Sequence, residues 1–350
     1  MLKIRKYKLK KFTVNLSVFI VTLIILLILS EISLRIIENI NEGSIIQFPN
    51  VIRPSKDQQL YFELVPNIKN QKFHETKISI NSEGYRDKEY SIEKPDNTIR
   101  IVALGDSVGF GWGVNLEDVY TEVLEKELNK NLDKNYEVLN FAVPGFYTAQ
   151  ELRMLESKAI KYSPDIILVI YLFNDAEVKS FHEYDKLTFI YRQLNFFMKR
   201  MSYLHYSLST VFAETRAKLN EREILGQPEK TYIDLLEAMF SENSEGWDLS
   251  KGSLIEIDKL AKESDSELIV VIFPDIQDLK NYKYENIHKI ILNFCKENNL
   301  NCMDLLESYK YYADTPMGTG PEKKDAHPDA LGHKIMANGI YKKLIDDNLV

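Results

Sequence analysis

Residues 99–113 read Ile-Arg-Ile-Val-Ala-Leu-Gly-Asp-Ser-Val-Gly-Phe-Gly-Trp-Gly, and this stretch decides the expected fold. Its first six residues form a compact, mostly apolar run with the length of a buried strand. A glycine, an acid and a serine follow at once, which predicts a sharp turn that exposes Ser107. Ligands of open α/β sheets bind beyond the carboxyl ends of the strands, so the residues after each strand are the candidates for a functional site.

Similar apolar runs recur along the chain and alternate with helical patterns. We expect strands at 99–104, 136–141, 165–172, 267–273 and 301–304, and helices at 116–131, 148–162, 286–298 and 330–347. The strands are apolar along almost their whole length, which is typical of a parallel sheet covered on both faces. Strands that alternate with helices predict a doubly wound α/β domain.

The N-terminus carries the strongest bias in the sequence. Six basic residues precede a run from Phe12 to Ser30 that has no charge and is nearly as long as the roughly 20 residues that cross a bilayer. The competing interpretation is a cleaved signal peptide, but the run exceeds the usual apolar length of about 7–15 residues and no small-x-small site follows it. We therefore expect residues 1–37 to be a cytoplasmic basic tail and an uncleaved transmembrane anchor in the lipid bilayer, with the rest outside the cytoplasm.

The remainder divides into a lead-in at 38–97, which we expect to pack on the main domain at 98–350. An aromatic-rich helical insertion at about 177–251 separates the third and fourth strands. It is interpreted as a lid, a membrane-resting surface, an interface or an ordinary helical excursion. Cys295 and Cys302 are expected to be two small buried residues, with a disulfide as the alternative. The formal net charge of -8 argues against a nucleic-acid partner.

Chemically capable residues follow several of the expected strands. Ser107 follows the first strand, Gly145 the second and Asn174 the third, while Asp325 and His327 precede the last helix. A histidine with a nearby carboxylate is what a serine nucleophile requires, because the ring takes the serine proton and the acid orients the ring. A phosphate-binding loop is the rival interpretation of the glycine-rich turn, but the stretch has neither a P-loop ending nor the spacing of a dinucleotide-binding loop. Each element alone is also compatible with an ordinary turn or cap.

Taken together, these blocks resemble the SGNH/GDSL hydrolase superfamily over residues 98–347. The lead-in stretch Asn81-Ser82-Glu83-Gly84-Tyr85-Arg86-Asp87 resembles its membrane-anchored bacterial members, which carry a similar stretch before the nucleophile block. The resemblance implies a three-layer α/β/α, flavodoxin-like sheet of about five strands. It implies that Ser107 is the nucleophile, His327 the general base and Asp325 the orienting acid. The amides of Ser107 and Gly145 and the side chain of Asn174 would form the oxyanion hole.

The sequence departs from the pattern of that family in two places. Many members carry the acid three residues before the histidine, where this chain has Lys324, and Asp325 stands only two before. The asparagine block often has a glycine where this chain has Leu172. A Ser-His pair oriented by a backbone carbonyl is therefore the alternative to a full triad. Asp106 is expected to shape the turn, and His333 to pack on the face of the last helix.

These residues predict a membrane-anchored serine ester hydrolase that acts on O-acyl or lipid-like esters, on a glycan or a lipid. The same residues would serve an O-acyltransferase that modifies a cell-surface polysaccharide, because only the acceptor differs. A non-catalytic, membrane-tethered binding module on the same scaffold is the third hypothesis. No cofactor and no metal ion are expected in any of the three.

Overall fold

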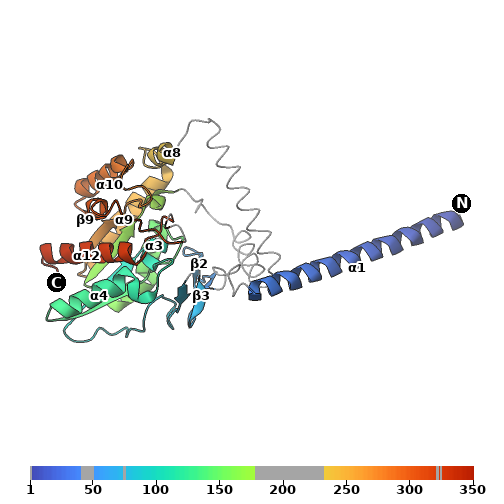
Figure 1. Cartoon of the computed structure of the whole chain (residues 1–350), viewed down its shortest axis with the longest axis horizontal. Coiled ribbons are helices and arrows are strands. Elements are labelled where there is room, and N and C mark those ends of the chain that lie inside the picture. The colour runs from blue at the N-terminus through green and yellow to red at the C-terminus, as the bar shows by residue number, and fades with distance from the viewer. Residues whose placement is uncertain (1, 41–50, 74–75, 178–231, 321–322, 324) are drawn as a thin grey trace. The chain divides into compact units, whose positions relative to one another are not determined.

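The computed structural model describes residues 2–40, 51–73, 76–177, 232–320, 323 and 325–350. The chain divides into two units, of which one comprises residues 1–50 and 186–226 and the other residues 51–185 and 227–350. The described part of the first unit is helix α1 (Leu2–Ile40), shown in blue in Figure 1. Most of the expected insertion, residues 178–231, lies outside the described residues.

Helix α1 contains a segment, Lys10–Ile36, that is long and apolar enough to cross a membrane. Its leucine, isoleucine, valine and phenylalanine side chains from Phe12 to Leu29 are exposed. A helix that is apolar on all sides needs an apolar surrounding, such as a bilayer. A signal sequence passes the same test of length and composition, so α1 by itself is compatible with either role.

The second unit is built on a five-stranded parallel sheet. Its strands are β5 (Thr98–Leu104), β6 (Asn135–Asn140), β7 (Ile166–Tyr171), β8 (Glu267–Ile272) and β9 (Cys302–Asp304). They lie in the order β6-β5-β7-β8-β9, so that the first strand of the sheet pairs with both the second and the third. This is the flavodoxin-like order, and the predicted fold class is confirmed.

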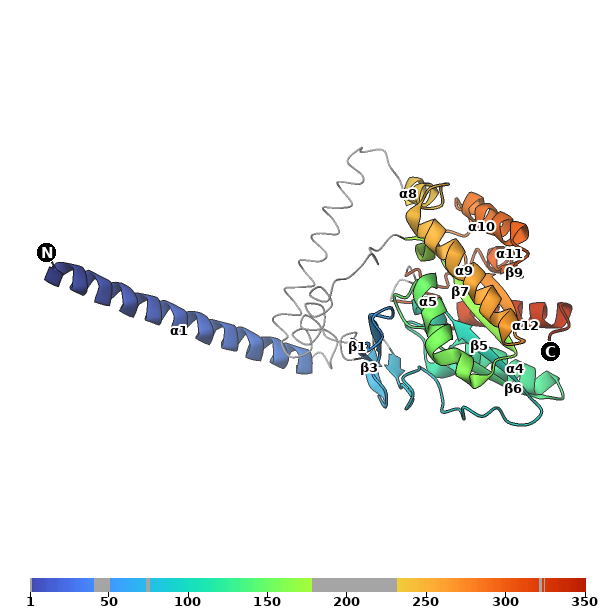
Figure 2. The same cartoon turned by 180° about the vertical axis from the view of Figure 1, so that it is seen from behind.

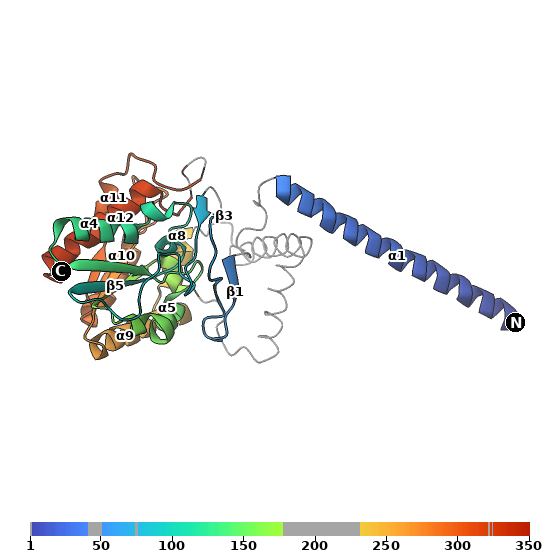
Figure 3. The same ribbon diagram turned by 90° about the horizontal axis from the view of Figure 1, so that it is seen from below.

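Helices cover both faces of this sheet. Helices α4 (Tyr120–Asn131) and α12 (Ala330–Asp346) pack together on one face, and α5 (Thr148–Met154) and α9 (Glu245–Glu263) pack together on the other. Figure 3 shows these two layers on opposite sides of β5, and Figure 2 shows α5 and α9 in front of the sheet. The other described helices of this unit are short segments and α10, bounded as follows: α3 (Ser107–Phe110), α8 (Tyr232–Met239), α10 (Glu285–Glu297) and α11 (Leu306–Lys310).

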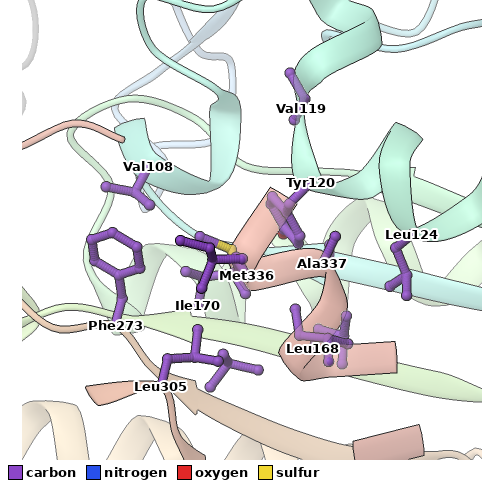
Figure 4. Packing of buried hydrophobic residues seen from close by; sticks show 14 of the residues in the cluster. Val108, Val119, Tyr120, Leu124, Leu168, Ile170, Phe273, Leu305, Met336 and Ala337 are labelled. Carbon is purple, nitrogen blue, oxygen red and sulfur yellow. The ribbon is translucent and has the colours of Figure 1, made fainter. Parts of the chain in front are cut away.

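The core between the sheet and α4 and α12 explains why these strands are apolar throughout. Leu168 and Ile170 of β7 pack against Leu124 of α4 and against Met336 and Ala337 of α12, as Figure 4 shows. Successive residues of a strand point to opposite faces, and here both faces are covered by helices. The turn that carries Ser107 therefore follows a strand, β5, whose last five residues are buried.

The lead-in contains two short antiparallel hairpins. One joins β1 (Ile52–Pro54) to β2 (Phe62–Leu64), and the other joins β3 (Gln71–Phe73) to β4 (Thr76–Ile78). Strand β4 ends at Ile78, and a turn follows it. Asn81 closes that turn, since its Oδ1 accepts hydrogen bonds from the amides of Glu83 and Tyr85.

Two further expectations about helices need correction. The helix expected from Leu116 begins at Tyr120, because Val119 is extended (φ -67°, ψ 139°) and separates it from a short 3-10 turn, η1 (Leu116–Asp118). The helix expected at 148–162 is continuous only to Met154. It then widens into a π turn, η2 (Leu155–Ala159), and tightens into a 3-10 turn, η3 (Ile160–Tyr162). Periodicity alone does not distinguish these turns from α-helix.

The favoured interpretation of the two cysteines is also wrong, because Cys295 and Cys302 form a disulfide. It joins the last turn of α10 to the first residue of β9. Disulfides persist mainly in oxidising compartments.

Candidate active site

Ser107 lies at the start of α3, immediately beyond the carboxyl end of β5. Asp106 caps this short helix, because its Oδ1 accepts a hydrogen bond of 2.9 Å from the amide of Val108. At the far end, Gly111 closes the turn with φ +84°, in the left-handed region that favours glycine. A Cβ at Gly111 would lie 2.5 Å from Cγ2 of Val119, so the tight turn after the serine requires glycine at this position.

The structure brings Ser107, His327 and Asp325 into one hydrogen-bonded line. His327 Nε2 lies 2.8 Å from Ser107 Oγ, and His327 Nδ1 lies 2.6 Å from Asp325 Oδ1. With the proton on Nδ1, the ring donates to the carboxylate and accepts from the serine hydroxyl. This is the geometry in which an imidazole can remove the serine proton and an acid can hold the resulting charge.

The short spacing between Asp325 and His327 is compatible with this line. Asp325 Oδ1 accepts a second hydrogen bond, of 3.0 Å, from the backbone amide of His327. The side chain of Asp325 therefore folds back within the turn at 325–327. Its carboxylate reaches both the amide and the ring of His327, two residues later. At His327 Nδ1 the structure places the carboxylate of Asp325 and not a backbone carbonyl.

Backbone hydrogen bonds join the loop that carries His327 to residues 317–319. The amide of Thr319 donates to the carbonyl of His327 at 2.8 Å, and the amide of Asp329 donates to the carbonyl of Met317 at 2.6 Å. Asp329 also caps α12 by accepting from the amides of Leu331 and Gly332. The histidine is thus held between a backbone bridge and a helix N-terminus.

Trp112 supports the face of the His327 ring. The two rings are stacked, with centroids 5.3 Å apart and planes 22° from parallel. Phe73 of the lead-in packs edge-on against Trp112 at 4.8 Å. The second hairpin of the lead-in, β3–β4, therefore reaches the ring that stacks on His327 through an aromatic contact.

The three expected oxyanion donors lie at the ends of neighbouring strands. Asn174 lies in a 3-10 turn, η4 (Phe173–Ala176), directly after β7, and its Nδ2 donates to Asp106 Oδ2 at 3.0 Å. Gly145 follows β6, is exposed, and has φ +83°. Within the described residues, the amides of Ser107 and Gly145 donate no hydrogen bond to another protein group. A developing negative charge can therefore be met by amides that are free to donate.

Buried carboxyl groups lie behind this turn. Asp106, Asp175 and Glu151 are almost completely buried, and burial raises the pKa of each, most strongly for the last two. The negative charges of Asp106 and Asp175 further raise the pKa of Glu151. Asp175 Oδ2 accepts from the amide of Leu172 at 2.8 Å and so shapes η4, where the sequence lacks the usual glycine.

His333 is a structural residue in this arrangement. Its side chain is fully buried in α12, stacks on Tyr120 and accepts from the Tyr120 amide through Nδ1 at 3.4 Å. Burial, with smaller contributions from the charges of Arg86 and His327, lowers the pKa of His333 to about 3. The ring therefore stays neutral at ordinary pH.

Sequence analysis missed Arg86 as a residue that builds the site. Its guanidinium is fully buried and donates to the carbonyls of Phe110, Gly111 and Val114, all in the loop after Ser107. Burial lowers the pKa of Arg86 to about 10, which leaves it charged at neutral pH. The stretch Gly84-Tyr85-Arg86-Asp87 stood out in the sequence, but its partner loop lies some 25 residues later and only the fold brings them together.

Across the described ranges, no three histidine, cysteine, aspartate or glutamate side chains gather as they would around a metal ion.

Comparison with known proteins gives distant structural likenesses. No family model and no curated protein matches the chain. Among solved structures, it is similar to a lipase/acylhydrolase from Enterococcus faecalis (14% identity, 71% of this chain and 96% of that one, TM-score 0.42). It is also similar to TesA (11%, 72% and 99%, 0.42) and to a catalytic mutant of Axe2, an acetylxylan esterase from Geobacillus stearothermophilus (13%, 70% and 94%, 0.42). At such identities the likeness concerns the fold alone.

Proposed function

We propose that the protein is a serine ester hydrolase of the SGNH/GDSL type, with Ser107 as nucleophile, His327 as general base and Asp325 as orienting acid. The observation that carries the proposal is the hydrogen-bonded line from Ser107 Oγ through both ring nitrogens of His327 to Asp325 Oδ1, at 2.8 and 2.6 Å. Ser107 lies more than two hundred positions before Asp325 and His327 in the sequence, so its meeting with them is not a property of a local turn.

In the proposed mechanism, Ser107 Oγ attacks the ester carbonyl while its proton moves to His327 Nε2. Asp325 stabilises the imidazolium through Nδ1–H. The amides of Ser107 and Gly145 and Nδ2 of Asn174 donate to the tetrahedral oxyanion. The imidazolium returns the proton to the leaving alcohol, and an acyl-enzyme remains on Ser107. A water molecule then attacks the acyl carbonyl, giving its proton to His327, and the acid is released as Ser107 recovers its proton.

We further propose that α1 holds the protein in the cytoplasmic membrane with the hydrolase unit outside. The exposed apolar surface of Lys10–Ile36 supports an anchor, and the six basic residues before Phe12 support a cytoplasmic N-terminus. The disulfide between Cys295 and Cys302 supports an oxidising location for the unit that contains it.

Hydrolysis of p-nitrophenyl acetate by the detergent-solubilised full chain, together with labelling by a fluorophosphonate probe, tests the catalytic proposal. We expect one probe per chain, lost in Ser107→Ala, and a fall in kcat of roughly 10⁴-fold or more in Ser107→Ala and His327→Ala. Ser157→Ala is a matched control, because Ser157 lies in η2 and its hydroxyl bonds only the carbonyl of Arg153 within its own helix.

Stoichiometric labelling that persists in Ser107→Ala would assign the nucleophile elsewhere. A folded chain that neither takes the probe nor turns over the ester would contradict the enzyme and favour a binding module.

A further inference from the structure

The acid and the base of the proposed site lie on one exposed turn. Asp325 precedes His327 by two residues, and its side chain is 44% exposed, against 25% for the histidine. Solvent screens an ion pair in such a position. Because Asp325 belongs to the same turn, its carboxylate alone does not fix the ring relative to Ser107. A contact from the part of the chain that carries the serine would do so.

Trp112 makes a contact of this kind. Its backbone amide donates to the carbonyl of Ser107 at 3.0 Å, so the residue belongs to the turn that carries the nucleophile. Its indole stacks on the ring of His327, with centroids 5.3 Å apart and planes 22° from parallel. One residue therefore bonds the backbone of the nucleophile and covers a face of the base.

The packing around Trp112 holds its indole in place. Phe73, fully buried in β3, packs edge-on against the indole at 4.8 Å. Next to Trp112, Gly113 approaches Thr319 so closely that a Cβ would lie 2.8 Å from Thr319 Cγ2. The amide of Thr319 in turn donates to the carbonyl of His327 at 2.8 Å. The loop after the serine thus contacts both the lead-in and the loop of the base.

The stack differs in strength between the two protonation states of His327. When Ser107 attacks, the ring becomes a planar cation, and a cation within about 6 Å of an indole centroid is attracted by the negative face of the indole. The neutral imidazole gains only the weaker attraction between aromatic rings. An interaction that strengthens as the reaction proceeds raises kcat without tightening substrate binding.

We infer that Trp112 is a positioning residue for the base, that its indole stabilises the imidazolium of His327 during attack by Ser107, and that Phe73 of the lead-in acts through it. The inference rests on the proposed function, since it concerns the proton that His327 takes from Ser107. It makes the β3–β4 hairpin a contributor to the rate and not only to the fold.

Steady-state hydrolysis of p-nitrophenyl acetate by full-length variants tests the role of Trp112. We expect Trp112→Leu to lower kcat by roughly 3- to 30-fold with KM within about twofold, and Trp112→Phe, which keeps an aromatic face, to recover most of the loss. Trp247→Leu is the matched control, because Trp247 is a buried indole of α9 that packs against Phe294 of α10. Its kcat should stay within about twofold of the wild-type value.

Phe73→Leu tests the contribution of the hairpin. We expect kcat to fall by roughly 2- to 10-fold in the wild-type background and not to fall further in Trp112→Leu, because Phe73 acts through the indole. Phe294→Leu removes the corresponding edge-on partner of Trp247, at 5.4 Å, and controls for the loss of a buried ring. Additive effects of Phe73→Leu and Trp112→Leu would contradict the role of the hairpin.

Fluorescence reports the stack without any reaction. The chain has two tryptophans, so the emission of the Trp247→Phe chain comes from Trp112. A protonated imidazole quenches the emission of an indole in contact with it. We therefore expect acidification to quench the Trp247→Phe chain more strongly than the same chain with His327→Gln.

Other titratable groups near the ring are Asp325, Asp106 and His333, and all three are present in both chains. The difference in quenching between the chains therefore belongs to His327. Equal quenching in the two chains would contradict the stack.

An unchanged kcat in Trp112→Leu, a fall equal to that in Trp247→Leu, a rise in KM alone, or no recovery in Trp112→Phe would overturn the inference. If His327→Ala is inactive in the same assay, such a result leaves the proposed function standing. If His327→Ala keeps the wild-type kcat, the proposed function fails and the inference fails with it.

Discussion

At the scale of single residues, the carboxylate of Asp106 links the turn of Ser107 to the side chain of Asn174. One carboxyl oxygen accepts from the amide of Val108 and fixes the turn of Ser107, and the other accepts from Nδ2 of Asn174. Asn174 can therefore present its second N–H to an oxyanion while the first is held. Preorganised donors of this kind stabilise a transition state without reorganising during the reaction.

Replacing Asn174 by alanine should lower kcat on p-nitrophenyl acetate by about 10²–10³-fold with little change in KM, because the lost donor acts on the oxyanion. Steady-state kinetics on the purified variant measure this. Asn131→Ala is a suitable control, since Asn131 bonds only Glu127 within α4. A rise in KM at unchanged kcat would instead place Asn174 in ground-state binding.

The buried carboxyl group of Glu151 leads us to a prediction about how the free energy of unfolding depends on pH. Both of its carboxyl oxygens are buried without a hydrogen-bond partner, and burial raises its pKa well above the ordinary 4.5. Above pH 4.5 the unfolded chain loses this proton while the native chain keeps it. The free energy of unfolding should therefore fall by up to about 1.4 kcal/mol per pH unit between 4.5 and the raised native pKa.

Glu151→Gln removes this titration and should flatten the fall. Urea unfolding of the wild-type and Glu151→Gln chains at several pH values from roughly 5 to 8 measures how the free energy of unfolding changes with pH. The gain in stability of the glutamine variant should grow as the pH rises. A constant difference at every pH would mean that Glu151 does not hold a proton in the native state.

At the scale of elements, the sheet and its flanking helices were predictable because their periodicity is strong. The strands at 99–104, 165–172 and 267–273 are continuous apolar runs, and their expected bounds are within a residue or two of those in the structure. The break at Val119 and the π turn after Met154 were not predictable, since the apolar spacing of the sequence stays helical through both. The Cys295–Cys302 bond was open because sequence does not set the distance between two side chains.

Some residues of the candidate site were likewise predictable from the sequence, and others were not. The strand ends limited the search to Ser107, Gly145 and Asn174, and the histidine and its acid stood out near the last helix. Arg86 and Glu151 were missed, because their roles depend on partners that only the folded lead-in and sheet bring near. A buried arginine or glutamate has no local sequence signature.

The lead-in should be part of the folded hydrolase unit, and Arg86 tests this. Arg86→Lys cannot satisfy the carbonyls of Phe110, Gly111 and Val114 with one compact ammonium group, so the free energy of unfolding should fall by roughly 2–5 kcal/mol. Arg153→Lys, at a part-exposed ion pair with Asp57, should cost less than about 1 kcal/mol. Equal losses in the two variants, measured by urea unfolding, would contradict this role.

The disulfide that joins α10 to β9 should contribute to the free energy of unfolding. It closes a short loop with a sequence separation of seven residues, and a loop of this size is worth about 2–3 kcal/mol through the unfolded chain. Replacing Cys295 and Cys302 together by serine should lower the free energy of unfolding by about that amount. Activity on p-nitrophenyl acetate should remain, because neither residue contacts Ser107 or His327; loss of activity in a folded variant would show coupling to the site.

At the scale of the whole molecule, the chain combines an exposed apolar helix with a unit whose proposed chemistry needs only water as co-substrate. Such a hydrolase can act wherever its ester is found, so under the proposed topology α1, and not the site, decides its place in the cell. In that proposal the basic residues before Phe12 set the side of the membrane.

A carboxyl-terminal fusion to alkaline phosphatase, an enzyme active only outside the cytoplasm, should therefore be active in a bacterial host, and a fusion to a cytoplasmic fluorescent protein should stay dark. Replacing Lys3, Arg5, Lys6, Lys8, Lys10 and Lys11 by glutamine removes the charge bias and should reduce phosphatase activity, because positive charge holds the N-terminus on the cytoplasmic side. The fusion should also sediment with membranes and resist extraction by carbonate, which separates an anchor from a cleaved signal. Phosphatase activity that appears in the soluble extracytoplasmic fraction would mean that α1 is removed, and a bright fluorescent fusion would place the hydrolase unit on the opposite side.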